Sequence, residues 1–199
     1  GSGLRDERGL TNIQYTYKTN GFIDWEAMIN PDFIVLNREN YLKKDNPIDI
    51  NTLSDEELNE LKRKAKGHDR LILLAGLKEL AQLRGYSSIS SKAECTENGM
   101  VVTSSVEWVG NFETNQKHVV SCGLADANEF NTDGLASKYL TAIAENRAFS
   151  RAVRNFLMIH TVSDVETKFN PGEYDPKPEV LKSGPQFAIQ KKLKEAKKT

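Results

Sequence analysis

The chain has 199 residues, of which 38% are hydrophobic and 28% charged, with 13 glycines and 6 prolines. This length favours one domain with flanking segments, because a domain takes about 150 residues. No stretch reaches the roughly 20 apolar residues of a membrane span, and no secretory signal opens the sequence. Composition therefore excludes a membrane protein, a collagen and a disulfide-rich scaffold, and we expect a cytoplasmic location.

The net charge of −1 conceals an uneven distribution of charge along the chain. Segment 135–157 holds four cationic side chains against one glutamate, and segment 177–199 holds seven lysines against two glutamates, so these segments carry +3 and +5. Because the whole chain sums to −1, the remainder carries −9. Local fields matter more than overall charge for binding a polyanion, so these two segments are the candidate contacts for nucleic acid.

The two cysteines and three histidines lack the spacing of a metal site. Cys95 and Cys122 fall in strand-like segments, which predicts small buried apolar residues in a reducing compartment. The histidines are scattered over positions 68, 118 and 160. We therefore expect neither a metal nor another cofactor.

Segment 1–50 is predicted to be an N-terminal arm, because residues 4–50 show no sustained hydrophobic period. Short apolar bursts alternate there with Asn, Asp, Gly and Pro, which indicates irregular structure with short strands. Two placements are open. The arm lies across a neighbouring subunit, or it packs on the core of its own domain.

A helical period begins after Ser54. Ser54 and Glu57 have the spacing of a capping box, in which each side chain accepts a hydrogen bond from the backbone amide of the other residue. Leucines and alanines then recur at helical spacing up to Gly85, the expected residue just beyond the helix. Because Gly67 interrupts the pattern, the segment 55–84 is predicted to be one bent helix or two.

A three-stranded antiparallel meander is predicted next, over segments 86–96, 100–109 and 117–125. The period of the sequence changes from 3.6 to two at Tyr86. Asn98-Gly99 is a strong hairpin signal, because both central residues of a type I′ turn need positive φ.

Trp108 lies on the same face of the second predicted strand as Val102 and Val106, which favours a place in the core. The alternative is that Trp108, together with Tyr86, stacks on nucleic-acid bases.

A long helix is predicted over 135–157, and its arginines carry the functional hypothesis. Arg147, Arg151 and Arg154 follow the spacing i, i+4, i+7 and fall on one side of the helix, where we expect them to face outward. Arginine is always charged and its planar fork grips two phosphate oxygens, so this row predicts contact with successive phosphates. The other side carries the residues that we expect to pack on the sheet, Phe149, Val153 and Phe156.

The predicted fold class is therefore α+β, with the order helix, three-stranded meander, long helix in a domain spanning 51–165. Segment 166–199 is predicted to be a linker and a basic tail, because it combines four prolines and two glycines with eight lysines. The tail either docks a partner protein, adds non-specific affinity for DNA, or is simply solvated.

Two stretches resemble a known family. Residues 144–156 read Ala-Glu-Asn-Arg-Ala-Phe-Ser-Arg-Ala-Val-Arg-Asn-Phe. They resemble the signature helix of Rad-fifty-two-type and related phage single-strand annealing proteins, A-E-T-R-A-x-x-R-A-L-R followed by a small residue and an aromatic. Residues 123–127, Gly-Leu-Ala-Asp-Ala, resemble the turn G-x-A-[DS]-A that leads into that helix. The chain departs from the pattern at Asn146, where threonine is usual.

The resemblance implies a protein of DNA recombination and repair, not an enzyme, that binds single-stranded DNA and anneals complementary strands without ATP. It implies a homo-oligomer, either a ring or a filament, in the host cytoplasm if the protein is phage-encoded. Backbone contacts would come from Arg147, Arg151 and Arg154. Lys92 and Lys117 would add to a groove between the helical layer and the β-hairpin, or they are simply exposed charges on the strands.

Three other readings stay open. A double-stranded RNA-binding module shares the order α-β-β-β-α. A structural or protein-interaction domain would leave the arginine face merely solvated. A metal nuclease would need the carboxylates of Asp126, Glu129 and Asp133, which lack a supporting Lys or His.

Overall fold

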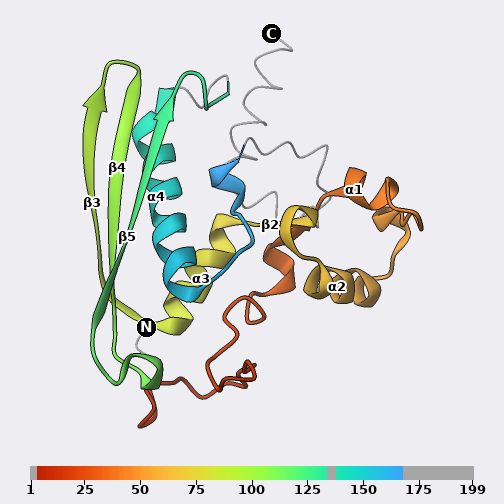
Figure 1. Cartoon of the computed structure of the whole chain (residues 1–199), viewed down its shortest axis with the longest axis horizontal. Coiled ribbons are helices and arrows are strands. Elements are labelled where there is room, and N and C mark those ends of the chain that lie inside the picture. The colour runs from red at the N-terminus through yellow and green to blue at the C-terminus, as the bar shows by residue number, and fades with distance from the viewer. Residues whose placement is uncertain (1–3, 134–137, 168–199) are drawn as a thin grey trace.

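The computed structural model describes residues 4–133 and 138–167, and it joins two groups of elements (Figure 1). The larger group is a three-stranded sheet with helices α3 and α4 on one face, and the smaller is built on a two-stranded sheet. The helices are α1 Arg38–Leu42, α2 Asp55–Lys64, α3 Leu74–Arg84 and α4 Leu140–Leu157. The strands are β1 Ile34–Leu36, β2 Arg70–Ile72, β3 Tyr86–Thr96, β4 Gly99–Trp108 and β5 Val119–Asn128. The mixed α and β content and the antiparallel meander agree with the predicted class.

The meander has the strand order β3-β4-β5, and the hairpin between β3 and β4 lies where the sequence predicts it. Its geometry differs from the expectation. Thr96 pairs with Gly99, so the two loop residues are Glu97 and Asn98, and neither they nor Gly99 has positive φ. The predicted type I′ turn is therefore wrong. Glycine is required at position 99 for another reason, because a Cβ there would clash with the carbonyl oxygen of Ala127 on β5.

The two faces of the sheet differ sharply. On β4, Val102, Val106 and Trp108 are buried beneath the helices, as predicted. The ring of Trp108 stacks on Phe156 of α4, with ring centroids 4.6 Å apart, so Trp108 belongs to the core.

On β5 the larger apolar residues point away from α4. Val120 and Leu124 are 60% and 58% exposed, because only small residues fit beneath the helix. A Cβ at Gly123 would overlap the backbone of Ala148 and Ala152. Cys122 shares the outward face and is exposed. Cys95 near the hairpin is exposed too, so the prediction of two buried cysteines is wrong.

The segment 55–84 forms two helices rather than one. The capping box exists, with the Glu57 carboxylate accepting from the Ser54 amide at 2.9 Å. Between α2 and α3 the chain turns at Gly67, whose φ is +58°, and then forms β2, which pairs with β1. The helical period was misleading here, because the consecutive apolar residues 71–73 are all buried, which suits a short internal strand.

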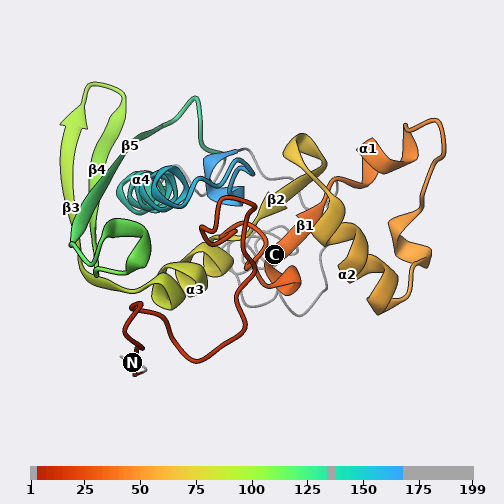
Figure 2. The ribbon, with the colours of Figure 1, turned by 60° about the horizontal axis from the view of Figure 1, so that its bottom comes forward.

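The N-terminal arm packs on the core of its own domain (Figure 2). Five apolar residues from the arm are buried in the main core: Leu10, Ile23, Trp25, Ile29 and Ile34. The carboxylate of Glu113 accepts hydrogen bonds from the Ile23 amide and the Trp25 indole, both at 3.0 Å. Of the two placements that the sequence left open, the described chain adopts this one.

Helix α4 begins at Leu140 and ends at Leu157, so its C-terminal end agrees with the prediction. The first residues of the predicted helix fall in segment 134–137, outside the described residues, as do residues 168–199 of the linker and basic tail. Phe149 and Val153 are buried on the side of α4 that was expected to face the core. None of the helices in the described parts of the chain is both long and apolar enough to cross a membrane.

Candidate nucleic-acid interface

Two arginines of the α4 row, Arg147 and Arg151, contact strand β5. Arg147 and Arg151 donate hydrogen bonds to the carbonyl oxygens of Asp126 at 2.9 Å and Leu124 at 2.7 Å. β5 is an edge strand, and these carbonyls lie on its unpaired side. One helical step of four residues covers about 6 Å, and two residues along a strand cover nearly the same distance. Successive arginines therefore match successive free acceptors.

Arg147 is fully committed to internal partners. Its guanidinium also donates to the carbonyl of Val165 at 2.8 Å and to both the side chain and the carbonyl of Asn131, at 3.0 and 2.7 Å. The residue is 8% exposed, and this burial lowers the pKa of its guanidinium. The expectation that Arg147 faces outward is wrong.

Arg154 is held by the short helical turn at residues 164–166. Nη1 lies 2.8 and 2.7 Å from the two carboxylate oxygens of Glu166, and Nε donates to the carbonyl of Thr161 at 2.7 Å. Arg151 shares Glu166 at 3.3 Å, but 41% of its side chain is exposed. Only Arg151 of the row thus presents much of its guanidinium to solvent, which corrects the prediction of an outward row of three.

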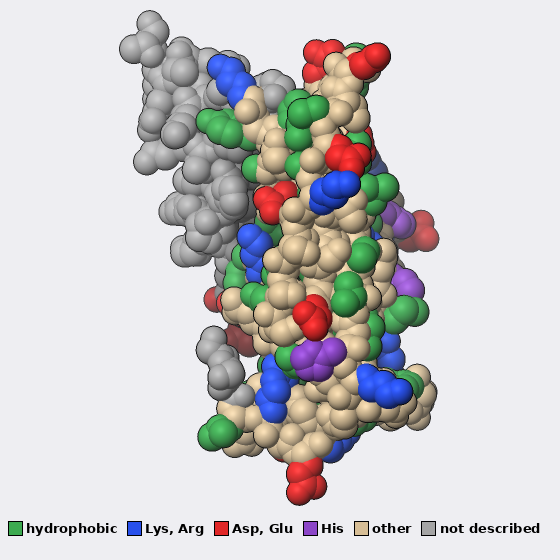
Figure 3. All heavy atoms as spheres, turned by 90° about the vertical axis from the view of Figure 1, so that its left-hand side faces the viewer, with side chains coloured by type: hydrophobic (Ala, Val, Ile, Leu, Met, Phe, Trp, Pro, Cys, Tyr) green, Lys and Arg blue, Asp and Glu red, His purple; other side chains and the backbone are tan. Residues whose placement is uncertain are grey.

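The two predicted lysines lie apart from the arginines. Lys92 is on the outer face of β3, away from α4, and its Nζ lies 2.8 Å from the Glu94 carboxylate. Lys117 is exposed just before β5 begins. Figure 3 shows this side of the molecule with acidic and basic side chains interspersed among uncharged atoms. The described structure therefore does not bring the five predicted residues together on one surface.

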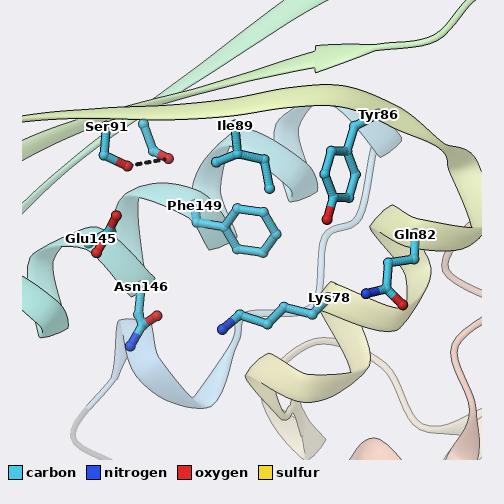
Figure 4. A pocket seen from close by; sticks show the side chains of 9 residues that line it. Lys78, Gln82, Tyr86, Ile89, Ser91, Glu145, Asn146 and Phe149 are labelled. Atoms are coloured by element: carbon cyan, nitrogen blue, oxygen red, sulfur yellow. Dashed lines mark hydrogen bonds between the residues drawn. The ribbon is translucent and has the colours of Figure 1, made fainter. Parts of the chain in front are cut away.

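A different feature occupies the place between the helical layer and the hairpin. α4 lies over β4 and β5, so β3 projects beyond it and leaves an open groove of about 400 Å³ (Figure 4). α3 closes the other side. The groove is lined by nine residues: Lys78, Gln82, Tyr86, Ile89, Ser91, Ser104, Glu145, Asn146 and Phe149.

The lining of the groove combines flat rings with polar groups. Tyr86 from β3 points into it with part of its ring exposed, and Lys78 extends from α3 toward α4 (Figure 4). The ring of Phe149 forms the floor of the groove but is only 6% exposed, so Tyr86 is the ring that a base can reach. Aromatic rings stack on nucleic-acid bases, and the amides of Gln82 and Asn146 can donate to and accept from base edges. One lysine and one glutamate leave the lining without net charge.

Sequence reasoning identified only part of this lining. Tyr86 was considered as a stacking residue, and Asn146 stood out where the family pattern has threonine. Lys78 and Gln82 were missed, because the helical face that they share lines a groove only where β3 projects over it in the folded chain. Their spacing of four residues on α3 was the available signal.

The acidic residues at the end of β5 and in the loop after it show no metal-binding arrangement. The carboxylate of Asp126 accepts from the side-chain amides of Asn128 and Asn131, at 2.9 and 2.7 Å. Throughout residues 4–133 and 138–167, no three His, Cys, Asp or Glu side chains gather as they would around a metal ion.

No family model matches the chain, and neither a curated protein nor a solved structure is detectably similar to it.

Proposed function

We propose that this protein binds single-stranded DNA in the groove between β3 and α4 and anneals complementary strands without nucleotide hydrolysis. The observation that carries the proposal is the groove itself. It lies between the hairpin and the helix that resembles the annealing signature, and the partly exposed ring of Tyr86 points into it, supported by the buried ring of Phe149. A single strand differs from a duplex in having base faces free to stack, so a ring-lined groove selects for it.

Binding in this groove relies on bases more than on phosphates. Lys78 and Glu145 cancel one another in formal charge, so few phosphates would be neutralised. For single strands the logarithm of the affinity falls by about 0.7 for each neutralised phosphate per tenfold rise in salt. We therefore expect a shallow salt dependence, whereas three outward arginines would give a steep one.

The arginine row has a supporting role in this proposal. Arg147 and Arg151 fasten α4 to the edge of β5, which holds Asn146 and Phe149 in place opposite β3. Arg151, the most exposed of the three, remains the one arginine that could also contact a strand leaving the groove.

Annealing further requires that many copies present bound strands to one another, so the proposal includes a homo-oligomer in which bases stay accessible. A partner protein at the basic tail and a role in recombination belong to the same proposal.

The test is fluorescence anisotropy with a labelled thymidine oligonucleotide, with a duplex RNA of equal length as competitor. The comparison uses the variants Tyr86→Phe and Tyr86→Leu. Phenylalanine keeps the ring, so the affinity should change less than about threefold. Leucine keeps apolar bulk but removes stacking worth about 1–3 kcal/mol, so the affinity should fall at least about fivefold.

Circular dichroism on both variants checks that the fold is retained. Equal affinity of Tyr86→Leu and the parent would contradict the groove assignment. Preference for the duplex would favour an RNA-binding module, and no binding to either would favour a protein-interaction domain.

A further inference from the structure

The outer edge of β3 is unpaired over its whole described length. β3 has eleven residues and is the first strand in the order β3-β4-β5, and no other described residue forms a bridge with it. Natural sheets usually protect such edges with proline, a bulge or a covering segment. The only irregularity of β3 lies at its start, between Tyr86 and Ser88, so residues 88–96 form a regular edge.

The backbone groups that are free on this edge follow from the register. Leu124 and Asp126 direct their carbonyls to the outer side of β5, so Ala125 directs its peptide groups to β4. Ala125 pairs with Val102, so Val102 directs its peptide groups to β5. Successive residues of a strand direct their peptide groups to opposite sides, so Thr103 directs its own to β3, where it pairs with Lys92. The backbone amide and carbonyl of Lys92 therefore hydrogen-bond to β4.

The residues on either side of Lys92 have the opposite orientation. Ser91, Ala93 and Cys95 direct their amides and carbonyls outward, away from β4. A strand that adds to this edge must place its own hydrogen-bonding residues opposite these three.

We propose that this edge pairs with the same edge of a second copy, antiparallel, about a two-fold axis at Ala93. The two sheets would then form one continuous sheet of six strands. In this register Ala93 faces its own counterpart, Ser91 faces Cys95, and all are outward-directed residues. Lys92 then lies directly opposite Glu94 of the other copy, twice by symmetry.

Charge selects this register from its neighbours. Lys92 and Glu94 lie on the outer face of β3, 79% and 63% exposed, and are paired within the chain at 2.8 Å. Moving the axis by one residue, to Lys92 or to Glu94, places two like charges directly opposite one another, which destabilises strand pairing. Only the axis at Ala93 faces each charge with its opposite.

Pairing would also complete the groove. Ser91 faces the groove side of β3 and lines it, and in the dimer Cys95 of the other copy lies beside Ser91 on that same side. The partner strand thus extends the roof of each groove across the two-fold axis. This last consequence rests on the proposed function, whereas the pairing itself does not.

The interface is the same patch on both copies, so it closes at two. A ring or filament would need a second interface in addition.

The test is the molecular mass of the full chain without DNA, measured by light scattering over a concentration series. The parent should be a dimer. Lys92→Glu places four carboxylates about the axis and should give a monomer, as should Glu94→Lys through four ammonium groups. The double variant Lys92→Glu with Glu94→Lys restores two opposite pairs and should restore the dimer. A monomeric parent, or single variants that stay dimeric, would overturn the proposal.

A cross-link checks the register independently. Ala93→Cys, in a background with Cys95→Ser and Cys122→Ser, places two thiols across the axis at the Cα separation of about 5.5 Å that a disulfide accepts. It should oxidise to a covalent dimer, whereas Ser105→Cys in the same background, on the outer face of β4, should not. Equal cross-linking of both would contradict the register. Because these measurements use no DNA, they can succeed even if the groove binds none.

Discussion

The guanidinium of Arg147 donates a hydrogen bond to the carbonyl oxygen of Asp126 at 2.9 Å, and this contact joins helix α4 to the free edge of strand β5. An edge strand with open acceptors invites pairing with another chain. With the carbonyls of Leu124 and Asp126 occupied by arginine, the second half of β5 is a poor template. β3 at the opposite side of the sheet keeps its edge open. Of the two edges of the sheet, that of β3 is therefore the more available for pairing with another chain.

Replacing Arg147 should lower the stability of the fold, because its side chain is buried and not part of the charged surface. Arg147→Ala removes four partly buried hydrogen bonds and the packing of a buried side chain, so the free energy of unfolding should fall by about 2–4 kcal/mol. Urea denaturation followed by circular dichroism measures this. Arg63→Ala, at an exposed position on α2, is the control for loss of one positive charge. A loss below about 0.5 kcal/mol for Arg147→Ala would mean that the row is not structural.

Glu166 separates the two possible roles of the arginines. Glu166→Gln keeps a similar shape but removes the charge that holds Arg154 and Arg151. The Glu166 side chain is only 5% exposed, so water screens these ion pairs little. We expect stability to fall by about 1–3 kcal/mol. Affinity for a thymidine oligonucleotide should stay within about twofold of the parent, because the groove is unchanged. If releasing the arginines strengthens binding tenfold, they and not the groove hold the phosphates.

Asp164 should give the protein a pH-dependent stability. Burial raises the pKa of this carboxyl to about 6 from 3.8, while its Oδ1 accepts from the Leu74 amide at the start of α3. The folded protein therefore binds a proton more tightly than the unfolded chain, so this group's contribution is largest below pH 4. That contribution is lost as the pH rises through about 6.

Asp164→Asn keeps an oxygen acceptor for Leu74 and cannot ionise. Relative to the parent, its free energy of unfolding should rise by about 2 kcal/mol between pH 4 and pH 7, since one pKa unit corresponds to about 1.4 kcal/mol and the unfolded carboxyl is already partly ionised at pH 4. Urea titrations of both proteins at the two pH values measure the difference, in which other titrating groups cancel. If the difference in the free energy of unfolding between the two proteins does not change with pH, Asp164 has the same pKa in the folded and the unfolded chain.

The meander and its covering helix could be predicted because local and long-range signals agree there. The period of two places Val102, Val106 and Trp108 on one face, and the helical period places Phe156 toward them. Each pattern has only one apolar side, so burial leaves little choice.

The position of the arginines could not be predicted in the same way. A helical period shows that three guanidinium groups share one side of α4, but not what lies opposite that side. The carbonyls of β5 and the carboxylate of Glu166 reach it only in the folded chain. Their acceptors are mostly backbone, which has no signal in the sequence.

Cys122 was misplaced because alternation alone does not say which face of a strand is inward. Gly123 and Ala125 were the informative residues, since an alanine-rich helix needs small residues beneath it. The groove is harder still to predict, because α3, β3 and α4 each contribute only a few of its residues.

The affinity of Glu145→Lys for a labelled thymidine oligonucleotide tests the groove most directly, because a misfolded variant cannot gain affinity. The substitution turns the neutral lining into one with two cations. Glu129→Lys, the same change on an exposed loop outside the groove, serves as the control. We predict that Glu145→Lys binds about tenfold tighter than the parent and with a steeper salt dependence, while Glu129→Lys changes affinity less than about threefold. Equal effects of the two substitutions, or none from either, would contradict binding in the groove.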